Sequence, residues 1–410
     1  VGSEMCIRDR NNKDCCGCEA CSQICPKACI EMRTDNEGFL YPHVDFSQCI
    51  NCNLCEKVCP VIHPQVPLDI QAAYGFKNPS KEIRLQSSSG GFFSKISEFV
   101  LKQNGVVFGS RYDKDWNVII DYTEDINGLS MFRGSKYVQS QNNNTFYKAK
   151  QFLKTNRLVL YSGTPCQIAA LKNYLQKDYD NLITLDFICH GVPSPGVWKK
   201  YLNEITTNSK TTLCHKDLSI TDINFREKIG YGWEKYGFTI RVKSNSETVS
   251  NPILLSQSHS DNPFMKAFLN NIIIRPSCSA CPAKAGRSHS DVSMADFWGI
   301  KEISPKFYDK NGVSLIFAHN EKGNNIIKKL GGEQLEVSCK DVSITNISYS
   351  HSSPLHTNRT LFFSKWHSES IITLMNTLSK PSLTDQVKYL IRLALIKTNL
   401  NYKLNKLLKR

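Results

Sequence analysis

Two runs of cysteines near the N-terminus have the spacing most suited to chemistry. Each run reads C-x2-C-x2-C-x3-C-P, and the two are Cys15, Cys18, Cys21, Cys25 and Cys49, Cys52, Cys55, Cys59. This spacing is typical of proteins that bind two 4Fe–4S clusters, in which the fourth cysteine of each run binds the other cluster. We therefore expect one cluster on Cys15, Cys18, Cys21 and Cys59, and a second on Cys49, Cys52, Cys55 and Cys25.

A zinc ribbon and a disulfide framework are the alternatives for these cysteines. Zinc sites usually pair two C-x2-C units across a longer loop and do not need the repeated C-P run. Disulfides suit a secreted protein. Because the same spacing occurs twice, we favour the iron–sulfur interpretation. Cys16 and Cys29 fall outside the pattern and are interpreted as buried bystanders.

Four later cysteines could form another centre. Residues 157–162 and 181–188 are apolar enough for buried strands, and residues 167–175 between them suit a helix, which predicts a βαβ unit with parallel strands. Cys166 and Cys189 then follow strand ends at the ligand-binding edge of the sheet. The helix N-terminus should lower the pKa of Cys166. Cys278 and Cys281 supply a C-x2-C pair. On spacing alone, a third 4Fe–4S cluster and a pair of core cysteines beside a zinc or empty C-x2-C remain equally open.

Two polar segments are candidates for binding a phosphorylated cofactor. Ser89, Gly90 and Gly91 precede an apolar helix near residues 92–100, and a helix N-terminus offers free N–H groups to a phosphate. An ordinary capped helix would look the same. The turn Arg133–Gly134–Ser135–Lys136 is basic and could meet a phosphate or a flavin ring, or lie on the surface. His190, beside Cys189, could move protons, although a structural role is commoner for a loop histidine.

The elements that must position these residues suggest four segments. We expect an α+β ferredoxin-like two-cluster domain at 11–66 with a hairpin at 31–48, and then an α/β domain with βαβ units. The α/β domain has an N-terminal portion at 70–160 and a C-terminal portion at 161–345. Residues 346–410 form a basic helical tail that could dock on a partner, lie on a membrane surface, or pack on its own domain.

Composition bounds the class of protein. The chain has 410 residues, 17 cysteines and a formal charge of +14. Many cysteines in metal-binding spacings indicate a reducing compartment, and with no secretory signal or long apolar run we expect a cytoplasmic protein. No nucleic-acid-binding motif accompanies the basic charge, so we expect no nucleic acid partner. Residues 1–10 look like a foreign or truncated start, and Cys6 is not interpreted.

A series of motifs resembles one family. S-G-G-F-F-S from Ser89, R-G-S-K-Y-V-Q-S from Arg133, G-T-P-C-Q ending at Gln167, C-H-G-V-P-S-P from Cys189, C-x2-C-P from Cys278 and A-D-F-W-G-I from Ala295 occur in this order. The order resembles the coenzyme F420 hydrogenase/dehydrogenase beta-subunit family, preceded by a ferredoxin domain. Bacterial members that look similar are often associated with polysaccharide synthesis.

The resemblance implies an iron–sulfur flavoprotein oxidoreductase that contains FAD. It favours a third 4Fe–4S cluster on Cys166, Cys189, Cys278 and Cys281, and a flavin near Ser89–Gly91 and Arg133–Lys136. Electrons would come from a ferredoxin-like donor, or from a larger oxidoreductase complex, and pass to an organic acceptor. The deazaflavin coenzyme is not assumed to be that acceptor. The alternatives are a non-catalytic electron-transfer subunit and a structural zinc protein.

Overall fold

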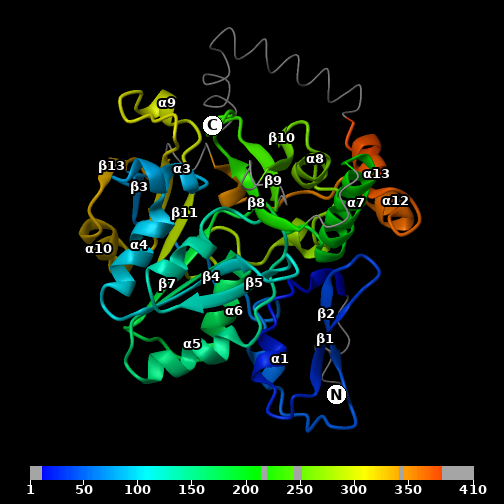
Figure 1. Cartoon of the computed structure of the whole chain (residues 1–410). Helices are drawn as coiled ribbons and strands as arrows, with labels where there is room; N and C mark the ends of the chain where they lie inside the picture. Colours follow the sequence, from blue (N-terminus) through cyan, green and yellow to red (C-terminus); the bar gives the residue numbers. More distant parts are fainter. Residues whose placement is uncertain (1–11, 214–218, 244–251, 341–345, 381–410) are drawn as a thin grey trace, which may run out of the picture.

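The computed structural model of the chain describes residues 12–213, 219–243, 252–340 and 346–380. A small N-terminal domain comes first and lies beside a much larger α/β body (Figure 1). Its β1 (Ile30–Thr34) and β2 (Leu40–Val44) form the predicted antiparallel hairpin. Short helices flank the hairpin: η1 (Asn12–Asp14), α1 (Ala20–Ile24) and α2 (Leu54–Lys57).

An eight-stranded mixed sheet forms the centre of the body, in the order β13-β3-β12-β11-β7-β6-β4-β5. Its strands are β3 (Ala72–Lys77), β4 (Val106–Tyr112), β5 (Val118–Thr123), β6 (Val159–Gly163), β7 (Leu182–Phe187), β11 (Val292–Asp296), β12 (Ser314–Ala318) and β13 (Glu333–Val337). Strands β4, β6, β7 and β11 run parallel, and the other pairings are antiparallel. The predicted βαβ unit is confirmed, because β6 and β7 are parallel neighbours. One sheet thus takes strands from both 70–160 and 161–345.

Helices cover both faces of this sheet. Alternate residues of a strand face opposite sides, so Tyr161 packs against α5 (Thr145–Lys154) and α6 (Pro165–Leu175), whereas Leu160 packs against α4 (Phe92–Leu101) and α10 (Glu321–Lys329). Helix α6 begins directly after β6 because Thr164 and Gln167 form a reciprocal capping box and Pro165 occupies the first turn. The shorter helices are α3 (Lys81–Gln86), η2 (Asn127–Phe132), α9 (Ile300–Ile303) and η4 (Ile347–Tyr349).

A second core lies beside the main sheet. The antiparallel strands β8 (Ile220–Glu227), β9 (Gly237–Val242) and β10 (Ile253–Ser258) pack with helices α7 (Pro195–Leu213), α8 (Pro263–Leu269), α12 (Arg359–Lys365) and α13 (Ile371–Leu378). Phe362 and Ile371 are fully buried in this core. The segment from 346 to 380 is therefore part of the folded body (Figure 1). The rest of the predicted basic tail, 381–410, lies outside the described residues.

Candidate iron–sulfur and cofactor site

The structure brings together the cysteines predicted to hold the first cluster. Burial raises the pKa of Cys21, and the nearby Cys15 and Cys59 raise it further. Cys18 likewise has Cys59 and Cys21 among its charged neighbours. Cys59 therefore lies with the first run of cysteines, as expected if the fourth cysteine of each run crosses to the other group.

The second group lines a single pocket at the far end of the same domain. Cys25 crosses from the first run to join the second, and the pocket-lining cysteines are Cys25, Cys29, Cys49, Cys52 and Cys55. Cys29 is an addition, since its Sγ lies 3.4 Å from the Sγ of Cys25. Cys52 is exposed. This group therefore lies nearer the surface than the first.

The four later cysteines also meet. Cys166 lies in the first turn of α6, Cys189 follows β7, and η3 (Pro276–Ala280) carries Cys278 just before Cys281. Burial raises the pKa of Cys189; the charge of Lys284 lowers it, and Cys278, Cys166 and Cys281 raise it again. Four thiols from three separate connections thus form one buried group.

The predicted effect of the helix N-terminus on Cys166 was wrong. We expected a lowered pKa, but contact with the thiol of Cys16 raises it, and burial raises it further. The thiol of Cys166 also lies 3.2 Å from the hydroxyl oxygen of Thr164. The helix N-terminus is therefore outweighed by a neighbouring thiol that the sequence did not place there.

Cys16 is that thiol, and it connects two groups of cysteines. It is buried, and its side chain contacts both Cys18 of the first group and Cys166 of the third. The residue between two ligands of a tight run carries no spacing signal of its own. Sequence reasoning therefore missed its position.

The donor set at the third group fits an iron–sulfur cluster. Among the residues that the structure describes, no three His, Cys, Asp or Glu side chains are arranged to hold a single metal ion. In a 4Fe–4S cluster each thiolate binds a different iron, so the sulfurs surround the cluster instead of converging on one point. Four buried thiols at one place suit that arrangement better than mononuclear zinc.

The two segments proposed for a flavin also come together. The hydroxyl oxygen of Ser88 accepts a hydrogen bond from the backbone N–H of Ser135 at 2.7 Å. Arg133 donates through Nε to the hydroxyl of Ser94, in the first turn of α4. The loop before α4 and the basic turn thus form one surface. The Gly90 N–H, however, donates to the Ser314 hydroxyl and so does not face a ligand.

Buried basic side chains support this loop, and the sequence did not reveal them. Arg226 donates to the carbonyl of Ser88 and forms an ion pair with Asp296 of the A-D-F-W-G motif. Lys228 donates to the carbonyl of Ser89 at 2.8 Å. Burial lowers the pKa of Lys228 to about 7, and burial likewise lowers the pKa of Lys136 to about 7. A marked separation along the chain hides these partners from any local pattern.

All these groups lie at one edge of the sheet. Cys166 and Cys189 follow the carboxyl ends of β6 and β7, and Asp296 ends the parallel neighbour β11. The Ile188 N–H, next to Cys189, donates to the carbonyl of Met294, two residues before Asp296. This is the edge where open α/β sheets bind ligands. The third cysteine group and the Ser88 loop are therefore close along β11.

Two further predictions concern His190 and membrane contact. The Nε2 of His190 lies 2.6 Å from the Oδ1 of Asn271, and burial lowers its pKa. That environment is structural and favours the neutral ring. In the described part of the chain, no helix is both long and apolar enough to cross a bilayer.

Comparisons with known proteins agree with these groups. Residues 156–342 match the family model for the C terminus of the beta subunit of coenzyme F420 hydrogenase/dehydrogenase, and residues 14–62 match a 4Fe-4S dicluster domain. A structure from Methanosarcina barkeri, of the xenon-derivatised F420-reducing NiFe hydrogenase complex, is 16% identical with a TM-score of 0.41. The match covers 67% of this chain and 84% of that one. No curated protein matches the chain.

The matched ranges contain the cysteines described above. The dicluster match includes both N-terminal groups, and the beta-subunit match includes all four members of the third. The chain belongs to the coenzyme F420 hydrogenase/dehydrogenase beta-subunit family and carries an N-terminal 4Fe–4S dicluster domain.

Proposed function

We propose that this chain is an iron–sulfur flavoprotein that passes electrons between a ferredoxin-type donor and an organic acceptor. The observation that carries the proposal is the sequence of contacts from the first cysteine group, through Cys16, to the third group at the sheet edge. That edge also carries the Ser88–Ser135 surface. Redox centres connected in this way provide a route for electrons through the protein.

Electrons enter at the second N-terminal group in this proposal. Cys52 is exposed, and Ile50 beside it is 56% exposed. A donor can therefore approach that cluster more closely than the first one, whose ligands Cys18 and Cys21 are buried. The family description is of a beta subunit, and we include a larger oxidoreductase complex as the partner at this end.

The third cluster would be held by Cys166, Cys189, Cys278 and Cys281. Each thiol must lose its proton to bind iron. Lys284 assists at Cys189, because its ammonium donates to the Cys189 carbonyl at 2.5 Å and its charge lowers the pKa of that thiol, opposing the larger effect of burial. The protein thereby places a positive charge where cluster binding creates negative charge.

FAD would lie on the surface formed by the Ser88 loop and the basic turn. When bound, it would convert single electrons into a two-electron reaction on the acceptor. Ser89, Gly90, Gly91 and Arg133, Gly134, Ser135, Lys136 are the residues proposed to hold it. The N-terminus of the ten-residue α4 and the buried Lys136 supply positive potential for the phosphates. Arg226 and Lys228 position the loop by donating to its carbonyls.

Anaerobic purification followed by assays of iron, sulfide and flavin tests the proposal. We expect about twelve irons and one FAD per chain, since each 4Fe–4S cluster holds four irons. Clusters without flavin would support the alternative of a non-catalytic electron-transfer subunit. Zinc without acid-labile sulfide would contradict both functions.

The acceptor can be sought with the reduced protein. After anaerobic photoreduction, candidate organic acceptors are added singly and the flavin absorbance is followed. Rapid reoxidation by one class of acceptor identifies the substrate class. A flavin that no acceptor reoxidises, in a protein with full iron content, would favour the electron-transfer subunit.

A further inference from the structure

Arg275 is a buried cation placed between two groups of cysteines. Its Nε donates to the carbonyl of Cys15 at 2.7 Å, and its Nη2 donates to the carbonyl of Leu40 at 2.9 Å. The third hydrogen bond runs from Nη1 to Oε1 of Gln139, also at 2.9 Å. The residue has 0% relative exposure. All three acceptors are neutral oxygens, so none of them cancels the charge.

Aromatic rings complete the enclosure of this guanidinium. Its Cζ lies 4.0 Å from the ring centroid of Tyr41 and 5.4 Å from that of Phe39. Gly17 has a φ of +66°, and a Cβ there would lie 2.9 Å from the same Cζ. Glycine at this position therefore leaves room for the cation directly beside the first cysteine run.

The same residue is close to the third group. Arg275 lies three positions before Cys278, whose backbone N–H donates to the Arg275 carbonyl at 3.0 Å. Burial alone would lower the pKa of Arg275, but Cys15, Tyr41, Cys16 and Cys278 outweigh burial and raise it. Cysteines of both groups thus stabilise one charge.

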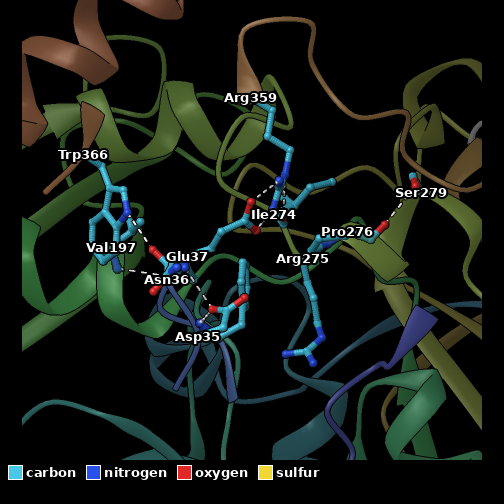
Figure 2. A network of polar contacts seen from close by, with 12 residues as sticks. Asp35, Asn36, Glu37, Val197, Ile274, Arg275, Pro276, Ser279, Arg359 and Trp366 are labelled. Carbon is cyan, nitrogen blue, oxygen red and sulfur yellow. Dashed lines mark hydrogen bonds and ion pairs between the residues drawn. The ribbon is translucent and has the colours of Figure 1, made fainter. Parts of the chain in front are cut away.

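Arg359 provides a contrast in the same interface. It forms an ion pair with Glu37 and also donates to the Ile274 carbonyl. In Figure 2 the guanidinium of Arg359 faces the Glu37 carboxylate, whereas that of Arg275 points away from it. A residue needed only to dock the two domains could have its charge paired in this way. The unpaired charge of Arg275 indicates a different role.

We propose that Arg275 is a fixed positive charge that raises the reduction potentials of the first N-terminal cluster and of the third cluster together. Each cluster gains one electron from its donor and becomes more negative, and a cation a few ångströms away in a poorly solvated site stabilises that reduced state. Raising both potentials together makes it easier for electrons to leave the donor without blocking transfer between the two clusters. The part that concerns the third cluster rests on the proposed function.

Anaerobic redox titration monitored by EPR of the reduced clusters tests this role in the full-length protein. For Arg275→Met we expect the ratio of reduced to oxidised cluster at a fixed potential to fall about tenfold. That change corresponds to about 59 mV for a one-electron couple. Arg275→Lys keeps the charge and should restore most of the ratio. The control Glu37→Gln/Arg359→Met weakens the same interface without changing the net charge and should leave the ratio unchanged.

Iron content decides how each outcome is interpreted. Unchanged potentials in Arg275→Met with full iron, or an equal change in the control, would overturn the proposal. If Arg275→Met loses iron, Arg275→Gln carries the same prediction, and iron loss from both neutral variants would assign Arg275 to cluster assembly instead. If the unmodified protein holds only about eight irons, the third cluster is absent and the proposed function fails. The effect on the first cluster is then still measured.

Discussion

The N-terminal domain gathers its cysteines within one short stretch, whereas the large domain takes its four from three separate connections of the fold. In the first case the spacing of neighbouring residues determines the group. In the second, Cys166 and Cys189 meet because β6 and β7 are parallel neighbours, and the Cys278–Cys281 pair is brought to them by packing. Similar donor sets are therefore built in two ways. The first depends on local geometry, and the second depends on the folded body.

The largest expected effect tests whether the third group is separate from the N-terminal groups. Cys166→Ser should lose about a third of the iron, because one of three four-iron clusters goes. The N-terminal pair should keep its EPR signals. Cys339→Ser is the control, since Cys339 lies outside all three groups, and it should keep all its iron. Unchanged iron in Cys166→Ser would mean that the ligand set is wrong.

A second prediction concerns how the two regions are held together. Glu37→Gln should lower the free energy of unfolding by about 3 kcal/mol, because it leaves the nearly buried Arg359 charge unpaired. Anaerobic urea unfolding followed by cluster absorbance measures the change. The control Glu31→Gln breaks an exposed pair with Arg33 and should cost less than about 0.5 kcal/mol. Equal losses would mean that the Glu37 pair adds nothing to docking.

A third prediction concerns the closest backbone approach between the regions. Gly38 has a φ of +80°, and a Cβ there would lie 2.7 Å from the Cα of Gly196. Gly38→Ala should therefore cost about 2 kcal/mol, with increased protease cleavage between residues 60 and 70. Gly230 has a φ of +81° but nothing within 4 Å of its Cβ position. Gly230→Ala isolates the backbone strain and should cost less; a similar loss would exclude a role for the close approach.

The smallest effect concerns pH and a carboxyl beside the third group. Burial raises the pKa of Asp186 to about 6. The folded state then binds more protons than the unfolded state between about pH 4 and 6, so stability falls as the pH rises through that window. Asp186→Asn removes this dependence. Its stability relative to the unmodified protein should therefore increase by about 1 kcal/mol from pH 5 to 7.5.

Asp45 supplies the matched control for this pH series. Hydrogen bonds from the side chains of Ser47 and Gln48 lower its pKa, so its titration lies below pH 5. Asp45→Asn should show no change relative to the unmodified protein between pH 5 and 7.5. A flat difference for Asp186→Asn as well would mean that its carboxyl is not titrating there.

The sequence was informative where partners are near in the chain. The cysteine runs, the hairpin and the βαβ unit all follow from spacing or periodicity over a few residues. Cys16, Arg226, Lys228 and Arg275 carried no such signal, because their partners are set by tertiary contacts; Arg275 reaches a carbonyl 260 residues away. The predicted pKa of Cys166 failed for the same reason, since only the fold brings Cys16 against it. Local rules predicted the elements, and packing determined the electrostatics.

The contacts of the hairpin with α12 also bear on the order of synthesis. Glu37 pairs with Arg359, and the carbonyl of Asn36 accepts from the indole N–H of Trp366 (Figure 2). Domains generally fold from the N-terminus as the chain leaves the ribosome. The dicluster domain therefore emerges roughly 300 residues before its docking surface is complete. Its cysteines stay open to iron–sulfur delivery throughout that interval, and the last helices to be made close the protein over centres that are already loaded.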